Sequence, residues 1–425
     1  MDMREVKIGI IGMGTVGCGV YNVISKEGKY IAHKEGLKLT VKSVYSRHYH
    51  IDLPDEIKAQ SPEAIIADPE IDIICELIGG IEPANTIIKN ALAAKKTVVT
   101  ANKQLVASNW AELEAEARKS GAGLYFEASV GGGIPCLRAV TDSLQANYID
   151  SVYAIINGTT NFILTKMADQ GKDYLDVLKE AQELGYAEAD PTSDVEGYDA
   201  MYKLSILASL AFHTRLPLEY IHREGITKVS KKDIAAAKEL GYTIKLLAIA
   251  KRKGTKVQLR VHPTMLHNDH PLASVKGSFN AIYMHGSAVG EVMFYGRGAG
   301  DLPTASAVVS DIICAAHAHS HKYMSFMNLP NKVDPTLKFN DNWSTGFYLR
   351  FILEDTPGSL ANIATVLGNN GVSIESVIQR DIDERGASII LVTHETKELN
   401  VMDALKELEN LKVVKEIASV IRVER

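Results

Sequence analysis

The sequence predicts an α/β protein with three parts: a doubly wound parallel sheet, an α+β domain and a small βαββαβ module. Strand and helix signals alternate up to residue 130, and hairpins and longer helices follow up to residue 325. A stretch with prolines and asparagines then precedes the last module. At 425 residues the chain is too long for a single hydrophobic core, which agrees with two or three domains.

The composition is that of an ordinary globular protein, with 46% apolar residues, 23% charged residues and a net charge of −6. This mild acidity argues against a nucleic-acid partner. No apolar run reaches the roughly 18 residues that span a bilayer, and the charged N-terminus leaves no room for a signal peptide. We therefore expect a cytoplasmic protein whose scattered cysteines stay reduced, namely Cys18, Cys75, Cys136 and Cys314.

A glycine pattern follows the first expected strand, residues 6–11, and precedes a helix expected over residues 18–25. The pattern is GxGxxG, and it comprises Gly12, Gly14, Thr15, Val16 and Gly17. In such patterns the first glycine permits a tight turn, the second lets the backbone approach a pyrophosphate, and the third packs helix on strand. The segment therefore predicts dinucleotide binding.

The alternation continues with strands expected over 37–45, 71–78, 97–100 and 123–126 and helices over 83–94 and 110–120. This is the order of a Rossmann-type sheet, expected to occupy residues 1–133. Ligands bind such sheets at the carboxyl ends of the strands. The residues expected there, beyond the glycine pattern, are Gly79, Thr100 and Lys103.

The end of the second strand predicts a preference for NADP over NAD. NAD-binding folds usually place an acidic residue there, whereas NADP-binding folds place an arginine nearby. The chain has Arg47 at this point and no acid before Asp52. We expect Arg47 to bind the 2′-phosphate, the alternative being a solvent-exposed arginine.

The α+β domain is expected over residues 134–325, with a linker over 326–345. Its strands are expected over 149–156, 257–261, 281–286 and 288–294, its helices over 174–184, 199–212 and 304–316, and a turn over 157–159. Gly185 is placed to end the first of these helices. A glycine-rich turn at 295–300 suits close approach to a cofactor or to another domain.

Charged residues gather in the segment 188–203, directly before an apolar run. Asp199 and Lys203 are four residues apart and would share one face of a helix. Residues 204–212 leave almost no polar side, which predicts a buried helix. A lysine desolvated beside carboxylates marks an acid/base site, whereas a solvated ion pair is the alternative.

The segment 346–425 predicts a ferredoxin-like βαββαβ module. Strands are expected over 346–353, 372–379, 387–393 and 414–423, with helices over 359–369 and 401–409. Gly358 would lie at a helix N-terminus, where backbone N–H groups can hold a carboxylate.

The chain resembles homoserine dehydrogenase, in the form with a C-terminal ACT domain, over nearly its whole length. The most specific motif is GYAEADP at 185–191, followed by Asp194, Asp199 and Lys203. Other matching segments are TANK at 100–103, EASVGGGIP at 127–135, NGT at 157–159, GAG at 298–300 and the ACT turn LEDTPGSL at 353–360.

The resemblance implies reversible hydride transfer from NADPH or NADH to L-aspartate 4-semialdehyde, which gives L-homoserine for threonine, methionine and isoleucine biosynthesis. Lys203 is implied as the proton donor and Lys103 as a second cation that polarises the carbonyl. Glu188 would hold the substrate ammonium, and Asp194 and Asp199 would orient its hydroxyl end and Lys203. Further implied contacts are Gly158, Thr159 and Tyr186 for the substrate, and Gly185, Glu188 and Gly300 for the cofactor.

The resemblance also implies a sodium ion held by the Glu127 side chain and the backbone of Val130, Gly132 and Ile134, which would order a joint between domains. It implies a homodimer or homotetramer. The ACT domain would take an amino-acid effector near Asp355, with threonine the expected candidate; a module that only pairs subunits is the alternative.

Other functions have weaker support in the sequence. Cys314, His317, His319 and His321 have metal-like spacing, but only His317 and His321 would share a helix face. His267 and His270 are expected on the surface, and no GxSxG nucleophile motif occurs. The remaining rivals are a nucleotide-sensing regulator that binds an amino acid and an oxidoreductase for a related amino-acid aldehyde.

Overall fold

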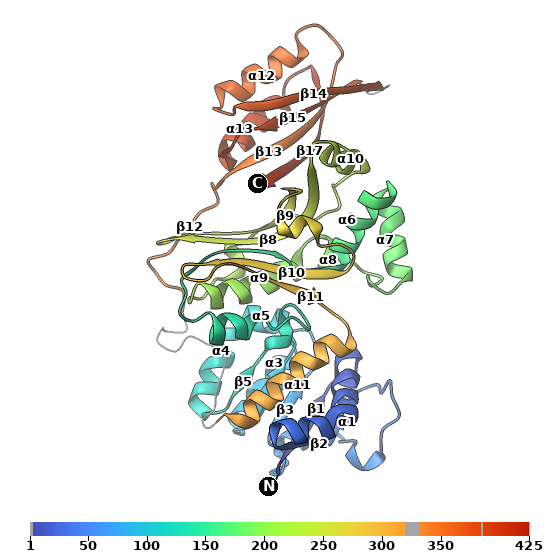
Figure 1. Ribbon diagram of the computed structural model, residues 1–425, viewed down its shortest axis with the longest axis vertical. Helices are drawn as coiled ribbons and strands as arrows, with labels where there is room; N and C mark the ends of the chain where they lie inside the picture. Colours follow the sequence, from blue (N-terminus) through green and yellow to red (C-terminus); the bar gives the residue numbers. More distant parts are fainter. Residues whose placement is uncertain (1–2, 319–331, 384–385, 425) are drawn as a thin grey trace. The chain divides into compact units, whose positions relative to one another are not determined.

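The structure is a computed structural model that describes residues 3–318, 332–383 and 386–424, without the side chains of 380–383 (Figure 1). It divides into two compact units, each built from three segments of the chain. The first unit comprises Met1–Gly158, Asp199–Ile221 and Phe279–Leu337. The second comprises Thr159–Tyr198, His222–Ser278 and Lys338–Arg425.

The first unit contains the predicted parallel sheet, with strand order β2-β1-β3-β4-β5. All its pairings are parallel. The order reverses between β1 and β3, which is where such sheets bind ligands. The strands are β1 (Arg4–Ile11), β2 (Leu37–Tyr45), β3 (Ile73–Glu76), β4 (Thr97–Thr100) and β5 (Leu124–Tyr125).

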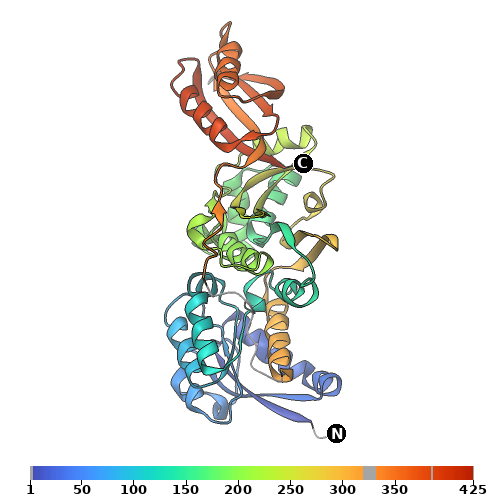
Figure 2. The same cartoon turned by 90° about the vertical axis from the view of Figure 1, so that its left-hand side faces the viewer.

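Helices cover both faces of this sheet, as Figure 2 shows. On one face α1 (Thr15–Glu35) packs with α11 (Asp301–His317), and both share a core with β1 and β2. On the other face α3 (Ala84–Ala93) packs with α4 (Lys103–Ser120). Helix α11 thus belongs to the dinucleotide-type sheet although it lies far along the chain. Shorter helices are α2 (Pro62–Ala67) and the 3-10 turns η1 (Asp55–Ile57) and η2 (Glu127–Ser129).

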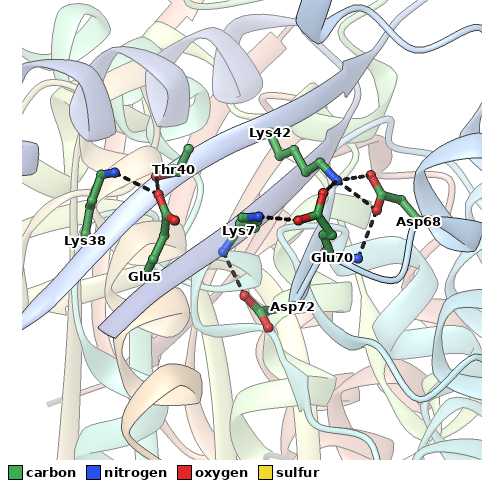
Figure 3. A network of polar contacts seen from close by, with 8 residues as sticks. All are labelled: Glu5, Lys7, Lys38, Thr40, Lys42, Asp68, Glu70 and Asp72. Atoms are coloured by element: carbon green, nitrogen blue, oxygen red, sulfur yellow. Dashed lines mark hydrogen bonds and ion pairs between the residues drawn. The ribbon is translucent and has the colours of Figure 1, made fainter. Parts of the chain in front are cut away.

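Charged contacts cover the edge strand β2 (Figure 3). Lys42 Nζ lies 2.7 Å from Asp68 Oδ2 and also pairs with Glu70, and Lys7 Nζ lies 2.6 Å from Glu70. Lys38 Nζ lies 2.9 Å from a Glu5 oxygen. Charge on an edge strand hinders its pairing with other strands.

The first unit also holds an antiparallel sheet in the order β11-β10-β6. These strands are β6 (Ile149–Ile155), β10 (Phe279–Gly286) and β11 (Gly290–Arg297), close to the expected spans. Helix α9 (Tyr198–Ala211) is the expected buried helix, and from Ala200 to Leu210 only Met201 and Tyr202 are not buried. The remaining elements are α5 (Cys136–Arg138), the π-turn η3 (Ala139–Ser143) and η4 (Leu218–Tyr220).

Several elements of the second unit differ from expectation, and helix α10 and strand β8 had no predicted counterpart. The turn expected at 157–159 is short, because Gly158 already begins helix α6 (Gly158–Gln170). The hairpin of β8 (Tyr242–Lys253) and β9 (Lys256–His267) is much longer than the single strand expected at 257–261. Other elements are α7 (Tyr174–Glu183), α8 (Thr192–Val195), β7 (His222–Arg223), α10 (Lys231–Glu239) and η5 (Pro271–Ser274).

The predicted βαββαβ module is confirmed, with the antiparallel strand order β17-β13-β15-β14 and a core between its sheet and helices. The end of β17 pairs in parallel with β9, so this module and the β8–β9 hairpin form one sheet. The elements are β13 (Ser344–Leu353), α12 (Ser359–Asn369), β14 (Ile374–Asp383), β15 (Gly386–Thr393), α13 (Glu398–Leu408) and β17 (Val414–Glu424), with short strands β12 (Lys338–Phe339) and β16 (Thr396–Lys397). None of the helices within the described residues combines the length and hydropathy of a membrane span.

Candidate active site

The glycine pattern after β1 has the geometry that a bound dinucleotide requires. Gly12 has φ of 106°, and a Cβ there would lie 2.6 Å from the Leu77 carbonyl carbon. A Cβ on Gly17 would lie 2.0 Å from the Gly12 oxygen, so helix α1 packs directly on the turn. A Cβ on Gly14 would meet nothing within 4 Å. The space beside Gly14 is where a pyrophosphate approaches the helix N-terminus, next to Thr15 and Val16.

A cavity of about 310 Å³ borders this turn. It is lined by Gly12, Gly14, Arg47 and Ile78, among others. The cavity therefore joins the pyrophosphate turn to the end of β2, where the ribose of a bound dinucleotide is recognised. The exposed Arg47 side chain lies at this end, and the residues present fit a dinucleotide.

Glu76 organises the loops after β3 and β4, a role that the sequence did not reveal. Its side chain is fully buried and accepts hydrogen bonds from Ile78 N at 2.8 Å and Thr100 Oγ1 at 2.7 Å. Burial raises the pKa of Glu76, although these hydrogen bonds act in the opposite direction. Asn102 then caps α4 through Leu105 N and donates to Gly80 O, which fixes the start of the helix that carries Lys103.

The predicted pair on α9 lies in the interior of the first unit. Lys203 Nζ donates to Asp199 Oδ2 at 2.7 Å and to the Ile156 carbonyl oxygen at 2.9 Å. The side chains are 10% and 4% exposed, so this is a buried ion pair and not a solvated one. The carbonyl of Ile156 comes from the loop between β6 and α6, two residues before the predicted Gly158.

A second lysine contacts the same carboxylate. Lys103 Nζ lies 2.8 Å from Asp199 Oδ1, and Asn157 Nδ2 donates to Asp199 Oδ2 at 3.0 Å. Burial alone would raise the pKa of Asp199, but the charges of Lys203 and Lys103 outweigh it and hold the pKa well below its ordinary value. Asp199 is therefore an anion that holds one buried and one half-exposed ammonium group.

Gly158 belongs to the first unit, whereas the predicted substrate residues Thr159, Tyr186, Glu188 and Asp194 belong to the second. Thr159 Oγ1 donates to the Tyr186 carbonyl oxygen at 2.6 Å, which ties α6 to the loop after α7. Gly185 has φ of 75° and ends this helix region as expected. Glu188 is exposed, whereas Asp194 in α8 is half-buried.

The predicted cation site contains a buried carboxylate cluster. Glu127 is fully buried and accepts hydrogen bonds from Leu137 N at 2.9 Å and Arg138 N at 2.7 Å. Asp311 accepts from Glu127 N at 2.9 Å, and the Arg138 guanidinium lies 3.7 Å from Asp311 Oδ1. Burial raises the pKa of both carboxyls, that of Asp311 to about 8.

The glycine turns of the first unit touch each other through their backbones. A Cβ on Gly132 would lie 2.4 Å from the Gly298 oxygen. Gly131 and Gly132 have φ of 73° and 55°, and the bond from Ile134 N to Gly131 O closes their turn. Val130 O accepts a hydrogen bond from Cys136 Sγ. Gly300, with φ of 120°, starts α11.

The predicted histidine cluster at the end of α11 is only partly within the described residues. His317 ends α11 and lies 3.4 Å from Glu35, while His319 and His321 are outside the described residues. No group of three or more His, Cys, Asp or Glu side chains within the described ranges could hold a metal ion. Gly358 precedes α12 with φ of 92°, as expected for the turn that also contains Asp355.

A parallel sheet with this glycine turn, together with a buried lysine–aspartate pair, defines an NAD(P)-dependent oxidoreductase. Three family models match the chain: "Homoserine dehydrogenase, NAD binding domain" over residues 12–127, "Homoserine dehydrogenase" over 135–313 and "ACT domain" over 347–413. The chain belongs to the homoserine dehydrogenase family and carries a C-terminal ACT domain.

Known relatives match the chain over most or nearly all of its length. The chain is 42% identical to the homoserine dehydrogenase of Bacillus subtilis, with 99% of each chain covered. The crystal structure of a homoserine dehydrogenase from Thiobacillus denitrificans has a TM-score of 0.91 and 40% identity, covering 99% of both chains. A hyperthermophilic archaeal homoserine dehydrogenase in complex with NADPH has a TM-score of 0.64 and 31% identity, covering 74% of this chain and 98% of that one.

Proposed function

We propose that the chain reduces L-aspartate 4-semialdehyde to L-homoserine reversibly, with Lys203 as the group that gives and takes the proton. The observation that carries this proposal is the single carboxylate of Asp199 that holds both lysines at 2.7 and 2.8 Å. A bound reduced dinucleotide supplies the hydride to the aldehyde carbon. The Lys203 ammonium donates a proton to the carbonyl oxygen in that step.

Asp199 has two functions in this mechanism. Its negative charge offsets the cost of burying the Lys203 ammonium, and its hydrogen bond fixes the direction of that group. Lys103, which is more exposed, adds positive charge that stabilises the developing oxyanion. We propose that Glu188 binds the substrate ammonium and that Asp194, Gly158, Thr159 and Tyr186 complete the substrate site.

Two lysine variants test the proton role. Lys203→Ala should lower kcat about 10²- to 10⁴-fold, because the general acid is lost. Lys203→Arg keeps the charge but cannot release a proton at neutral pH, so it should be nearly as inactive. The measurement is NADPH absorbance with aspartate semialdehyde as substrate, alongside the melting temperature.

Normal turnover of a folded Lys203→Ala protein would contradict the assignment. Binding of the dinucleotide without any turnover of wild type would favour a nucleotide-sensing regulator. Turnover of a related aldehyde but not of aspartate semialdehyde would favour a different oxidoreductase.

We propose further that the cofactor is NADP in preference to NAD, with Arg47 on the 2′-phosphate. The position of Arg47 beside the cavity at Gly12 and Gly14 supports this, as does the NADPH bound to the archaeal relative. Arg47→Ala should reduce kcat/KM for NADPH about 10-fold or more with little change for NADH, because a charged hydrogen bond contributes about 1.5 to 3 kcal/mol. An unchanged ratio of the two kcat/KM values would refute the role of Arg47.

A cation site is the next proposal. We propose a sodium ion at Glu127 and the backbone of Val130, Gly132 and Ile134, since a buried carboxylate beside a tight glycine turn suits a hard cation. Its test is a Na⁺-dependent rise in melting temperature, compared with choline chloride, that Glu127→Gln abolishes.

We assign cofactor binding to residues 1–133, substrate binding and pairing of subunits to 134–325, and amino-acid regulation to 346–425. We further propose that the protein is a cytoplasmic homodimer or homotetramer. Its pathway is the biosynthesis of threonine, methionine and isoleucine.

A further inference from the structure

A cavity of about 250 Å³ lies wholly within the second unit, and its lining contains none of the predicted substrate or cofactor residues. Its walls come from α6, α10, the start of β8 and the segment around η5. Pockets for drug-sized ligands usually measure about 300 to 1,000 Å³. This cavity therefore suits a smaller molecule.

A buried lysine of β8 forms part of the lining. Lys245 is 2% exposed, and its Nζ donates to Asn161 Oδ1 at 2.9 Å and to the Val275 carbonyl oxygen at 2.5 Å. Both acceptors are neutral, and Lys245 forms no ion pair with any residue in the ranges 3–318, 332–383 and 386–424. An ammonium group has three N–H donors, so the third can serve a ligand.

The surroundings of Lys245 differ from those of Lys203 in the first unit. Lys203 contacts the carboxylate of Asp199, whereas burial beside the charge of Lys276 lowers the pKa of Lys245 to about 8. The charge of Asp169 acts in the opposite direction without restoring the ordinary value. Because a buried ammonium without a counter-charge is costly, a bound anion would stabilise the charged form of Lys245.

The other charges of the lining are mainly positive. Lys238 of α10 and Lys276 after η5 are both exposed and add two cations to that of Lys245. Asp169 of α6 is the one carboxylate among the described lining residues, and its Oδ1 lies 3.2 Å from Lys276 Nζ. The lining therefore has an excess of positive charge, which attracts an anion from solvent.

The cavity also offers an apolar surface. The side chains that form it are Leu164, Ala168, Ile234, Ile244 and Ala273. An inorganic anion would contact the lysines and leave this surface uncovered. A carboxylate with a short aliphatic chain would instead use both parts of the lining, since apolar contacts favour burial and a few polar groups set the orientation.

We propose that this cavity binds a small aliphatic carboxylate, whose carboxylate group accepts a hydrogen bond from Lys245 and whose chain contacts the apolar side chains of α6 and α10. The exposed Lys238 and Lys276 draw the anion to the site and are screened by water. Binding requires neither the dinucleotide nor turnover, so its outcome is independent of the proposed function.

The test is calorimetry on the full-length protein with butyrate as the probe, without dinucleotide or substrate. Butanamide has nearly the same shape without the charge, and butylammonium has the opposite charge. We expect butyrate to bind at millimolar concentration or below and the two controls to give no saturable heat. Inorganic phosphate, titrated separately, should bind more weakly than butyrate because it lacks the apolar chain.

Three lysine variants locate the site. Lys245→Met should weaken butyrate binding about 10-fold or more, because it removes the buried charge-assisted contact. Lys276→Met should weaken it by no more than about threefold, since its charge is exposed. Lys253→Met is the matched control at the exposed end of the same strand, outside the lining, and should leave binding unchanged. Circular dichroism confirms the folding of each variant.

A measurement on wild type tests the site even if Lys245→Met does not fold. At pH 8 about half of Lys245 is neutral, so binding of an anion beside it should take up about half a proton, and much less at pH 6.5. Calorimetry in two phosphate-free buffers of different ionisation enthalpy measures this uptake. The proposal would be overturned by no heat from butyrate, by equal binding of butanamide or tighter binding of phosphate, by no proton uptake at pH 8, or by butyrate binding that a folded Lys245→Met protein retains.

Discussion

Asp199 and Asp311 are both buried in the first unit, at 3% and 0% exposure, yet their surroundings favour opposite protonation states. Asp199 contacts two ammonium groups and one amide, and its pKa lies below the ordinary value of 3.8. Asp311 faces one guanidinium, that of Arg138, which also approaches Glu127, and its pKa rises to about 8. Burial raises the pKa of both carboxyls, but two lysines outweigh it at Asp199, whereas at Asp311 one guanidinium does not outweigh burial and the charge of Glu127.

This difference explains how one unit uses buried acids for two purposes. A carboxylate held ionised by two lysines can orient a charged proton donor, which catalysis requires. In the absence of a bound sodium ion, a carboxylate cluster that shares one guanidinium instead retains a proton and connects backbone segments, as Asp311 does at Glu127 N. The contrast predicts that the first cluster controls activity and the second controls stability.

The largest effect is expected from Asp199→Asn, which removes the charge but keeps the shape. Without its counter-charge the buried Lys203 ammonium loses stabilisation, and the neutral amine becomes more favourable. We expect kcat to fall about 10³-fold, within the range for loss of general acid–base catalysis. The pH above which the remaining activity falls should be lower than in wild type, because Lys203 then loses its proton more readily.

The control for this variant is Asp311→Asn, which makes the same chemical change in the other cluster and should leave kcat within about threefold of wild type. NADPH consumption at saturating aspartate semialdehyde measures both, and circular dichroism confirms folding. If both variants lost activity equally, the division between a catalytic and a structural carboxylate would be wrong.

A smaller effect, on stability, is expected from Asp311→Asn. In the folded protein Asp311 has its pKa raised from 3.8 to about 8, so between these values the native state binds more protons than the unfolded state. The free energy of unfolding of wild type should therefore fall as pH rises from about 5 to 8, and this decline should flatten above pH 8. Asparagine cannot titrate. The free energy of unfolding of Asp311→Asn should therefore fall less between pH 5 and 8 than that of wild type, by at least about 1.4 kcal/mol, the equivalent of one pKa unit.

Urea unfolding of both proteins at pH 5, 6, 7 and 8 gives this difference. Asp199 provides an internal comparison, since its lowered pKa adds stability that is present above pH 4 and is lost only in stronger acid. A pH dependence that is the same in Asp311→Asn and wild type would show that Asp311 is already ionised when folded.

Much of the fold followed from local patterns in the sequence. Strand β4 and helix α12 have the predicted bounds. The start of α12, for example, is marked in the sequence by Gly358, which directly precedes it. Helix α4 was expected at Trp110 but begins at Lys103, because Asn102 caps it through contacts to Leu105 and Gly80. Hairpin β8–β9 was missed in part, as buried strands without alternation resemble buried helices in sequence.

The site could be predicted only as far as its motifs extend. The face shared by Asp199 and Lys203 follows from their spacing, but the contact of Asp199 with Lys103 depends on tertiary packing between α9 and α4. Glu76 and Asp311 gave no such signal, since a single acid in an apolar segment shows neither its burial nor its partners. The only available indication was their apolar context, at the end of β3 for Glu76 and within α11 for Asp311.

The smallest effect is expected where charges pair at the surface. Lys42 contacts Asp68 and Glu70 beside the edge strand β2, with geometry as close as that of Lys203 and Asp199 (Figure 3). Water screens these charges, and the side chains lose rotational freedom when they pair. Lys42→Met should therefore change the melting temperature by no more than about 2 °C, and less still in 1 M NaCl. Differential scanning calorimetry at low and high salt measures the melting temperature. If Lys42→Met lowered the melting temperature as much as Asp199→Asn does, the proximity of the charges, rather than their burial, would set the importance of an ion pair in this chain.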